Sequence, residues 1–321
     1  MKNKFKILAF VLFAFTFSGC EYGLEQGFYR KYPVNVRANT MKTLKLANEL
    51  GYSFNSSESN SVYKEERYKD AISKIMLSDY RIMLISDIHI GIDKFGNEDE
   101  NIKSFLEKVS SLSGAQKPAF CFSLGDLADH GKESEFQKYQ TQIVEKLDEM
   151  GIKTFNLLGN HDLYNTGWLN YKKICYPYTS FYKLENDIDV STSLSFYALD
   201  SASASLGGET NSQQMIKFKT AIGKDTSTYK IVFTHVPVYA SQKDYFIFQN
   251  TVERNTLISV LASNNCVGLY DGHTHERHTS EIGFVEENIG ALFKDKKFYV
   301  LHIVGGDIFG KPTVTIEEIS F

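Results

Sequence analysis

Gly272-His273-Thr274-His275 stands just behind a short apolar run, Cys266 to Tyr270 (CVGLY). A short apolar run that ends at Gly, Asp or Asn is typical of a strand buried on both faces. Four more runs of this kind lie upstream, and each also ends in acidic, amide or imidazole side chains. Five strand ends therefore decide both the fold and the chemistry of this chain.

The four upstream runs differ in length but share this pattern. They are Arg81 to Ser86 before Asp87-Ile88-His89, Pro118 to Leu124 before Gly125-Asp126-Leu127-Ala128-Asp129, Thr154 to Leu158 before Gly159-Asn160-His161-Asp162, and Lys230 to Phe233 before Thr234-His235-Val236-Pro237. Apolar residues at helical spacing fill Glu98 to Ser111 and Glu133 to Met150. The alternation predicts an α/β fold, in which a sheet carries helices on its faces. Ligands of such sheets bind at the carboxyl ends of the strands, so we expect all five patches at one edge of one sheet.

The side chains at these ends form a donor set for metal ions. They comprise three carboxylates, one amide and five imidazoles: Asp87, Asp126, Asp162, Asn160, His89, His161, His235, His273 and His275. Nitrogen and oxygen donors without thiolate favour Mn, Fe or Zn, and a carboxylate such as Asp126 has two oxygens with which to bridge two cations. Two such metals clamp the attacking and leaving oxygens of a displacement and acidify a shared water. This chemistry suits phosphoryl transfer, whose transition state carries spread negative charge.

The five patches together resemble the signature of the calcineurin-like metallophosphoesterases: D-x-H, G-D-x-x-D, G-N-H-D, a His before a hydrophobic-Pro pair, and G-H-x-H. The resemblance runs from about Asp79 to His275. It implies a sandwich of two mixed β-sheets flanked by helices. Lys297 to Val304 and Pro312 to Ile319 form a β-rich tail that fits the second sheet of that fold.

The resemblance also implies a role for each residue. Asp87, His89 and His275 would hold one divalent metal, and Asn160, His235 and His273 the other, with Asp126 as the bridge and a metal-bound water as the nucleophile. His161 would contact phosphate and protonate the leaving oxygen, because a proton donor must stay free of metal. Asp162 would orient the His161 ring, since a neighbouring carboxylate fixes an imidazole's tautomer. Asp129 either supports one of these groups or is an ordinary turn acid.

Three positions differ from the motifs of two subgroups of the family, which narrows the range of expected activities. His130 stands where protein Ser/Thr phosphatases carry Arg, Asp162 where they carry Glu, and Asp129 where purple acid phosphatases carry a metal-binding Tyr. These departures disfavour both subgroups. His130, Tyr164 and Trp168 are candidate substrate contacts, with a solvated loop histidine and aromatic packing as the alternatives.

The motifs lack an evident arginine clamp for a dianionic phosphate, which favours phosphodiesterase activity. Phosphomonoesterase or nucleotidase activity is the alternative. An alternative of another class is a non-catalytic lipoprotein that binds surface components on the same fold, because a fold does not establish an activity.

The N-terminus predicts export and a lipid anchor. Three lysines precede the apolar stretch Ile7 to Phe17, which is too short to span a bilayer and is built like a secretory signal. Ser18-Gly19-Cys20 follows and resembles a bacterial lipobox. We therefore expect cleavage after residue 19, lipid on Cys20 and location at the cell envelope. Phe17 stands where Leu is usual, which leaves ordinary cleavage as the alternative.

The remaining chain divides into an anchor and extension at residues 20–78 and a phosphoesterase domain at residues 79–321. Residues 1–19 hold three of the 35 basic side chains and no acidic one, so their removal leaves 32 basic against 39 acidic, a net charge of −7. That balance disfavours binding of a nucleic-acid duplex. The expected partners are a small phosphoester and, through Cys20, the membrane.

Overall fold

A computed structural model of the chain describes residues 79–175, 181–184, 194–202, 207–210, 212–225, 229–239, 246–304 and 312–321. The predicted signal segment, Cys20 and the extension to residue 78 lie outside these ranges. Within them, no helix combines the length and the apolar character that a membrane crossing requires.

The first sheet has five strands in the order β11-β10-β1-β2-β3. At its centre β1 (Asp79–Ile85) runs parallel to β2 (Phe120–Ser123), and β2 runs parallel to β3 (Lys153–Asn156). On the other side of β1, β10 (Lys297–Val304) and β11 (Thr313–Ser320) add antiparallel pairs. The tail is therefore β-structured as predicted, but its assignment to the second sheet is wrong, because β10 pairs directly with β1.

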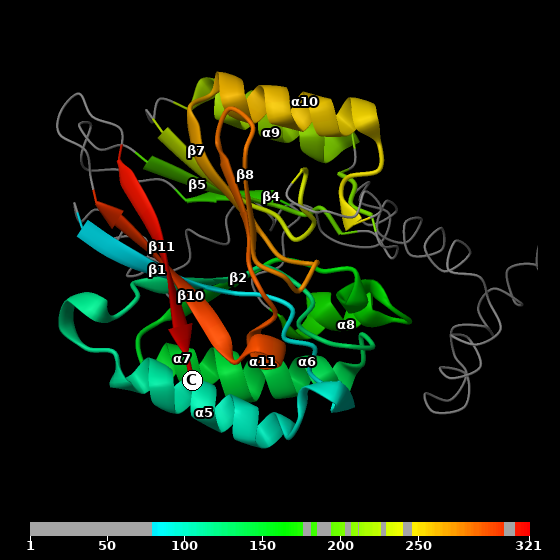
Figure 1. The fold of residues 1–321 in the computed structure, drawn as a ribbon. Helices are drawn as coiled ribbons and strands as arrows, with labels where there is room; N and C mark the ends of the chain where they lie inside the picture. Colours follow the sequence, from blue (N-terminus) through cyan, green and yellow to red (C-terminus); the bar gives the residue numbers. More distant parts are fainter. Residues whose placement is uncertain are drawn as a thin grey trace, which may run out of the picture.

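The second sheet has six strands in the order β4-β5-β6-β7-β9-β8. Their bounds are β4 (Phe181–Leu184), β5 (Leu194–Leu199), β6 (Tyr229–Phe233), β7 (Cys266–Asp271), β8 (His278–Glu281) and β9 (Val285–Asn288). The inner four are parallel, and the two edge strands are antiparallel. Three of the five predicted strand ends thus belong to the first sheet and two to the second, so the expectation of one shared sheet is wrong. The two mixed sheets flanked by helices, which the resemblance implied, are confirmed (Figure 1).

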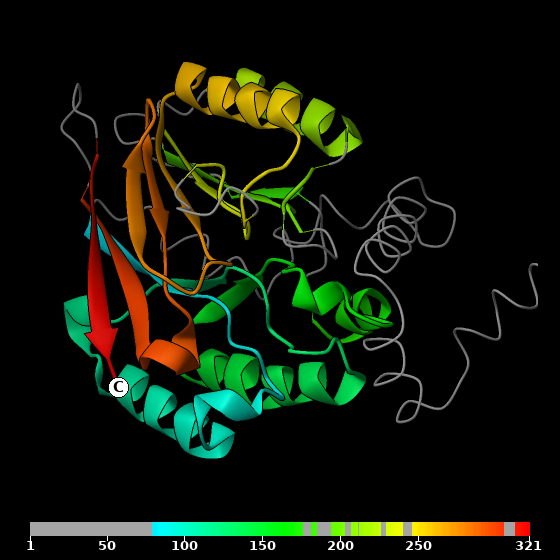
Figure 2. The ribbon, with the colours of Figure 1, turned by 45° about the vertical axis from the view of Figure 1, so that its right-hand side comes forward.

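Helices cover the outer face of each sheet. Against the first sheet lie α5 (Glu98–Ser111), α6 (Glu133–Tyr139), the π-helical segment η5 (Gln140–Val144), α7 (Glu145–Glu149), α8 (Gly167–Ile174) and α11 (Leu292–Asp295). The second sheet carries α9 (Ser212–Lys224) and α10 (Thr251–Ser263), and Figure 2 shows these two helices on the side away from α5. Helix α5 has the bounds predicted from its periodicity, and the Asn97 side chain caps it by accepting from the N–H groups of Asp99 and Glu100.

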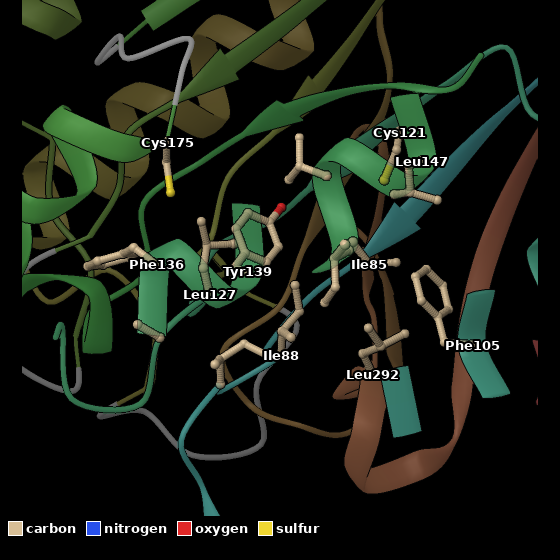
Figure 3. Close-up of a cluster of buried hydrophobic side chains, with 14 of the residues drawn as sticks. Ile85, Ile88, Phe105, Cys121, Leu127, Phe136, Tyr139, Leu147, Cys175 and Leu292 are labelled. Carbon is tan, nitrogen blue, oxygen red and sulfur yellow. The ribbon is translucent and has the colours of Figure 1, made fainter. Parts of the chain in front are cut away.

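Strand alternation builds the core in layers. Along β1, Met83 and Ile85 face the helices, whereas Ile82 and Leu84 face the second sheet. Figure 3 shows the helix-side cluster, in which Ile85 lies near Phe105 of α5. Replacing a buried ring of this size by Ala typically costs about 3–5 kcal/mol. Packing of this strength on both faces fixes where each strand ends, and the candidate site is built at those ends.

Candidate metal centre

The predicted donor residues lie in loops that directly follow the carboxyl ends of five strands, from both sheets. Asp87 follows β1, and His273 follows β7 of the other sheet. The two sheets meet here, because the His273 N–H donates to the carboxylate of Asp87 at 3.1 and 2.9 Å. Within the second sheet, the Gly272 N–H donates to the carbonyl of His235 at 2.9 Å. A site that sequence reasoning placed on one sheet edge is therefore formed where the edges of two sheets converge.

The backbone of these loops is strained at the donor residues. Eight described non-glycine residues have positive φ, and five of them are donors: Asp87, His89, Asp126, His273 and His275. Left-handed φ is unfavourable for residues with a Cβ, and it is retained mainly where function requires it. Gly159 is needed for a related reason, since a Cβ there would collide with the main chain and carboxylate of Asp126. The local conformation thus directs these side chains to one place.

The first donor group consists of Asp87, His89, Asp126 and His275, whose ligand atoms all lie within 4.8 Å of one another. The Nε2 atoms of His89 and His275 are 3.0 Å apart, and His275 Nε2 is 3.3 Å from Asp87 Oδ1. Except for the half-buried His275, these residues are buried. Imidazole nitrogens that converge on ionised carboxylates form a donor set for a divalent cation.

The second donor group shares Asp126 with the first and adds His235 and His273, again within 4.8 Å. His235 Nε2 lies 3.5 Å from Asp126 Oδ2 and 3.2 Å from the amide oxygen of Asn160. The His235 Nδ1 lies 2.8 Å from the Leu124 carbonyl, so Nδ1 is the donor and Nε2 is left for the group.

The two carboxylate oxygens of Asp126 have different partners. Oδ1 accepts the N–H of His161 at 2.8 Å. Oδ2 lies 3.6 Å from His89 Nε2 of the first group and 3.5 Å from His235 Nε2 of the second. One carboxylate oxygen is thereby common to both donor groups, which is the arrangement that a bridging ligand requires.

Charge at the centre is set by burial and by close opposite charges. Burial would raise the pKa of Asp87, but His275 and His235 outweigh it and hold that pKa below its usual range. Burial would also raise the pKa of Asp126, but His235 and His161 outweigh it and keep that pKa well below its usual value. Burial lowers the pKa of His89, which favours the neutral imidazole that a metal ligand must be. The carboxylates are therefore ionised, and His89 offers a lone pair.

His161 lies beside Asp126, which both groups share, and its ring forms with His89 and Asp129 a third cluster of possible ligand atoms within 4.8 Å, but it is held differently. Its Nδ1 donates to the backbone carbonyl of Asp129 at 2.8 Å, and the Asp129 carboxylate is 3.5 Å from the same nitrogen. The half-buried ring packs edge-on to His89, with centroids 4.5 Å apart. Burial lowers its pKa, but Asp126 and Asp129 reverse the effect and raise that pKa to about 9. His161 therefore carries a proton at neutral pH, with Nε2 as the exchangeable position.

Asp162 does not orient the His161 ring, so the role assigned to it from the resemblance is wrong. Its buried carboxylate accepts three backbone N–H groups, from Leu127 and Ala128 at 2.9 Å and from Gly159 at 2.8 Å. These bonds tie the loop after β2 to the loop after β3. Burial and the nearby Asp126 raise the pKa of Asp162 to about 8, while the N–H donors oppose this rise. Asp162 is a brace between two loops that carry donors.

Asp129 takes the place expected for Asp162. Its Oδ1 lies 3.0 Å from His89 Nδ1 and 3.5 Å from His161 Nδ1, and its Oδ2 lies 3.3 Å from His130 Nδ1. The first of these contacts leaves Nε2 of His89 to the metal group and increases the basicity of the ring. Of the two alternatives for Asp129, support of neighbouring groups is the one that the geometry fits.

Comparison with known proteins agrees with this geometry. The family model for calcineurin-like phosphoesterases matches residues 80–277. The chain belongs to this family.

Similar sequences and structures extend the match. A protein named as an uncharacterized metallophosphoesterase, YhaO of Bacillus subtilis, is 23% identical to this chain over an aligned length of 258 residues, and the match covers 73% of this chain and 60% of YhaO. This chain thus spans less than two-thirds of that relative. Two solved structures share the fold: a dimetal phosphatase from Danio rerio (TM-score 0.55, 12% identity, 73% of this chain and 98% of that one) and the purple acid phosphatase PPD1 of yellow lupin, Lupinus luteus (TM-score 0.53, 12% identity, 75% and 54%).

The three candidate substrate contacts of this calcineurin-like chain occupy different positions. Tyr164 is half-buried, its ring lies 4.6 Å from that of His161, and its hydroxyl accepts from the Asn160 amide at 3.3 Å. The His130 side chain is 37% exposed and contacts Asp129 and Glu135. Trp168 is only 2% exposed and belongs to the hydrophobic cluster under α8. A substrate cannot reach Trp168, so that prediction is wrong and the packing alternative is correct.

Asn288 is a residue of this site that sequence reasoning missed. From β9 its buried amide donates to the Asp271 carboxylate and the Gly272 carbonyl, and its amide oxygen accepts from the Thr274 hydroxyl. It therefore clamps the loop that presents His273 and His275. An Asn at the end of a short strand with mixed polarity gives no local signal of such a role.

Proposed function

We propose that this protein hydrolyses phosphoesters at a dinuclear metal centre. The observation that carries the proposal is the shared oxygen of Asp126, common to two donor groups, beside a protonated histidine that belongs to neither. Family membership and the phosphatase folds of its structural neighbours support hydrolysis in general terms.

The donor set fits two divalent cations of the Mn, Fe or Zn type. Asp87, His89 and His275 would hold one, Asn160, His235 and His273 the other, and Asp126 both. When bound, the two cations would neutralise phosphate oxygens and acidify the attacking water. The donor chemistry supports this assignment, because the set is nitrogen and oxygen throughout and its carboxylates are ionised.

His161 would act as the general acid. The Asp129 carbonyl fixes its Nδ1 as a donor, so the proton that moves is the one on Nε2. Asp126 and Asp129 keep that proton in place at neutral pH. As the bond from phosphorus to the leaving oxygen breaks, Nε2 would deliver its proton to that oxygen, a contribution of about 10²–10⁴ in rate.

Phosphodiesters are the favoured substrates over phosphomonoesters. Two cations close to the loop after β7 are already engaged: Arg277 pairs with Glu287 at 2.6 Å, and Lys294 donates to the His275 carbonyl at 2.8 Å. These two described side chains therefore offer little charge to the second negative charge of a monoester. A diester also leaves a poorer alkoxide, which gains more from the His161 proton. Phosphomonoesterase or nucleotidase activity is the competing assignment.

A cell-envelope location is part of the same proposal. It rests on the basic start, the apolar stretch Ile7 to Phe17 and Cys20. With lipid on Cys20, the phosphoesterase domain would stand at the membrane surface and act on small phosphoesters outside the cytoplasm.

One experiment tests the function. The purified protein is loaded with Mn, Fe or Zn and assayed with bis-(p-nitrophenyl) phosphate, p-nitrophenyl phosphate, cyclic nucleotides and nucleoside monophosphates. We expect turnover with a higher kcat/KM for diesters. Asp126→Asn should lose metal and rate together, and His161→Ala should keep both metals while losing about 10²–10⁴ in kcat.

The matched control is His278→Ala, which removes a half-buried histidine of β8 that belongs to neither donor group. It should retain both metals and full rate. Absence of turnover from protein that carries two metals would favour the non-catalytic alternative, and a preference for monoesters would favour the nucleotidase alternative.

A further inference from the structure

A sixth strand also ends beside the candidate metal centre. Strand β5 runs parallel to β6, with Ala198 opposite Phe233, so the loops that follow these two strands start at the same edge of the second sheet. Ser201 lies two positions beyond β5, and His235 lies two positions beyond β6. Both residues are 0% exposed. A buried hydroxyl is thereby placed next to a histidine of the second donor group.

The side chain of Ser201 holds the main chain of His235. Its Oγ accepts the His235 N–H at 3.0 Å and the N–H of Val236, which is also buried, at 2.9 Å. The His235 carbonyl in turn accepts the Gly272 N–H at 2.9 Å. A buried N–H group that loses its acceptor is costly, because it gives up water without regaining a partner. These contacts therefore fix the main chain from which the imidazole projects.

Ser201 is itself held in place by its neighbours. Its carbonyl accepts the Glu209 N–H at 3.0 Å. The preceding residue, Asp200, is bound twice by Gln214 of α9: the Gln214 amide oxygen accepts the Asp200 N–H at 3.0 Å, and the amide nitrogen donates to the Asp200 carbonyl at 2.7 Å. Ser201 thus offers an acceptor at a fixed position, which is what a residue that positions another one requires.

The far end of the loop after β6 has an anchor of its own. The buried carboxylate of Glu286 in β9 accepts the N–H groups of Val238 at 2.7 Å and of Tyr239 at 3.0 Å. Pro237 has no N–H group that needs an acceptor. Loss of the Ser201 hydroxyl should therefore disturb the start of this loop, where His235 lies, while Glu286 keeps its end in place.

We propose that Ser201 is a positioning residue, which sets the metal affinity of the second donor group through the main chain of His235. The Leu124 carbonyl aligns the His235 ring at Nδ1, at 2.8 Å, and Nε2 faces Asp126 Oδ2 at 3.5 Å. A shift of the main chain would move Nε2 away from the place where a cation would also meet Asp126. The inference rests on the dinuclear centre of the proposed function, and not on the reaction.

The effect should be confined to one of the two donor groups. His235 is a member of the second group and not of the first. The loss of an outer partner of a metal ligand typically weakens metal binding by about 10- to 100-fold. A residue that only supported the fold would instead lower stability without favouring either group.

The test measures Mn affinity at each donor group instead of turnover. The parent and Ser201→Ala are titrated with Mn(II), and electron paramagnetic resonance distinguishes a coupled metal pair from a single ion. The same change is made in His275→Ala, which keeps only the second group complete, and in His235→Ala, which keeps only the first. Ser201→Cys fills a similar space with a weaker acceptor, in case Ala disturbs the fold. The matched control is Ser195→Ala, which removes a buried serine hydroxyl near the start of β5.

We expect Ser201→Ala to weaken Mn binding at the second group by about 10- to 100-fold, both alone and in His275→Ala, and to leave the first group unchanged. It should add no loss in His235→Ala, because its effect passes through His235. Ser201→Cys should lie between Ser201→Ala and the parent. Ser195→Ala should match the parent at both groups.

Unchanged affinity at the second group in both Ser201 variants would overturn the inference. Equal weakening of the two groups would also overturn it, since Ser201 would then support only the fold. A parent protein that binds a single Mn ion at saturation would refute the dinuclear centre, and the inference with it. Failure of the two-metal parent to hydrolyse phosphoesters would count against the proposed function alone.

Discussion

Substitution of Asp129 by Asn separates support of a metal ligand from support of the general acid. The carboxylate contacts His89 Nδ1 at 3.0 Å and His161 Nδ1 at 3.5 Å. Asn has nearly the same shape but removes the charge. Any effect therefore reports electrostatic support of two imidazoles and not a change of packing volume.

The size of each effect follows from the other partners of the two rings. Asp129 is the partner at Nδ1 of His89, so the substitution should weaken metal binding at the first group by about 10- to 100-fold. His161 Nδ1 also has the Asp129 backbone carbonyl at 2.8 Å, and Asn keeps that carbonyl. The tautomer of His161 is thereby preserved. At saturating metal we expect kcat to fall by about 10- to 100-fold, less than the full contribution of a general acid.

The assay is a Mn titration of Asp129→Asn, followed by activity on bis-(p-nitrophenyl) phosphate and by measured metal content. His161→Ala and the parent protein are run in parallel. Unaltered metal affinity would show that His89 does not depend on Asp129. A fall in kcat as large as that of His161→Ala, at full metal occupancy, would show that the backbone carbonyl does not fix the tautomer, and either result would refute the reasoning.

Three further outcomes are expected. Asn288→Ala should weaken metal affinity at both groups by about 10- to 100-fold, because the clamped loop carries one donor histidine for each; an unchanged metal titration would exclude the clamp. Burial and Glu286 raise the pKa of Asp271 in the folded chain well above 3.8, its ordinary value, so the stability that its protonated form contributes is fully present below pH 3.8 and is lost as pH rises. Asp271→Asn, which is neutral at every pH, should therefore raise the melting temperature more at pH 8 than at pH 5. An equal change at both pH values would contradict this. Cys20→Ser should move the protein from the detergent phase to the soluble fraction or leave it unprocessed, whereas identical partitioning and mass would argue against the lipid.

The sequence by itself determined the donor chemistry and most of the elements. Asp126, Asn160 and His235 could be placed at strand ends because short apolar runs and residue type are local properties. The α5 bounds were also predictable, since helical periodicity and a capping Asn are read within a single segment. The order of the motifs then indicated the family, and with it a two-sheet fold.

Only the tertiary structure decided how these parts are joined. The pairing of β10 with β1, and the division of the donors between two sheets, depend on hydrogen bonds between segments far apart in the chain. Asp162 turned out to brace two loops, while Asp129 reaches His161, because three N–H groups draw the Asp162 carboxylate inward. The burial of Trp168 was likewise decided by packing against distant residues. Residue type and spacing determine which groups are available, but long-range packing and hydrogen bonding determine which of them meet.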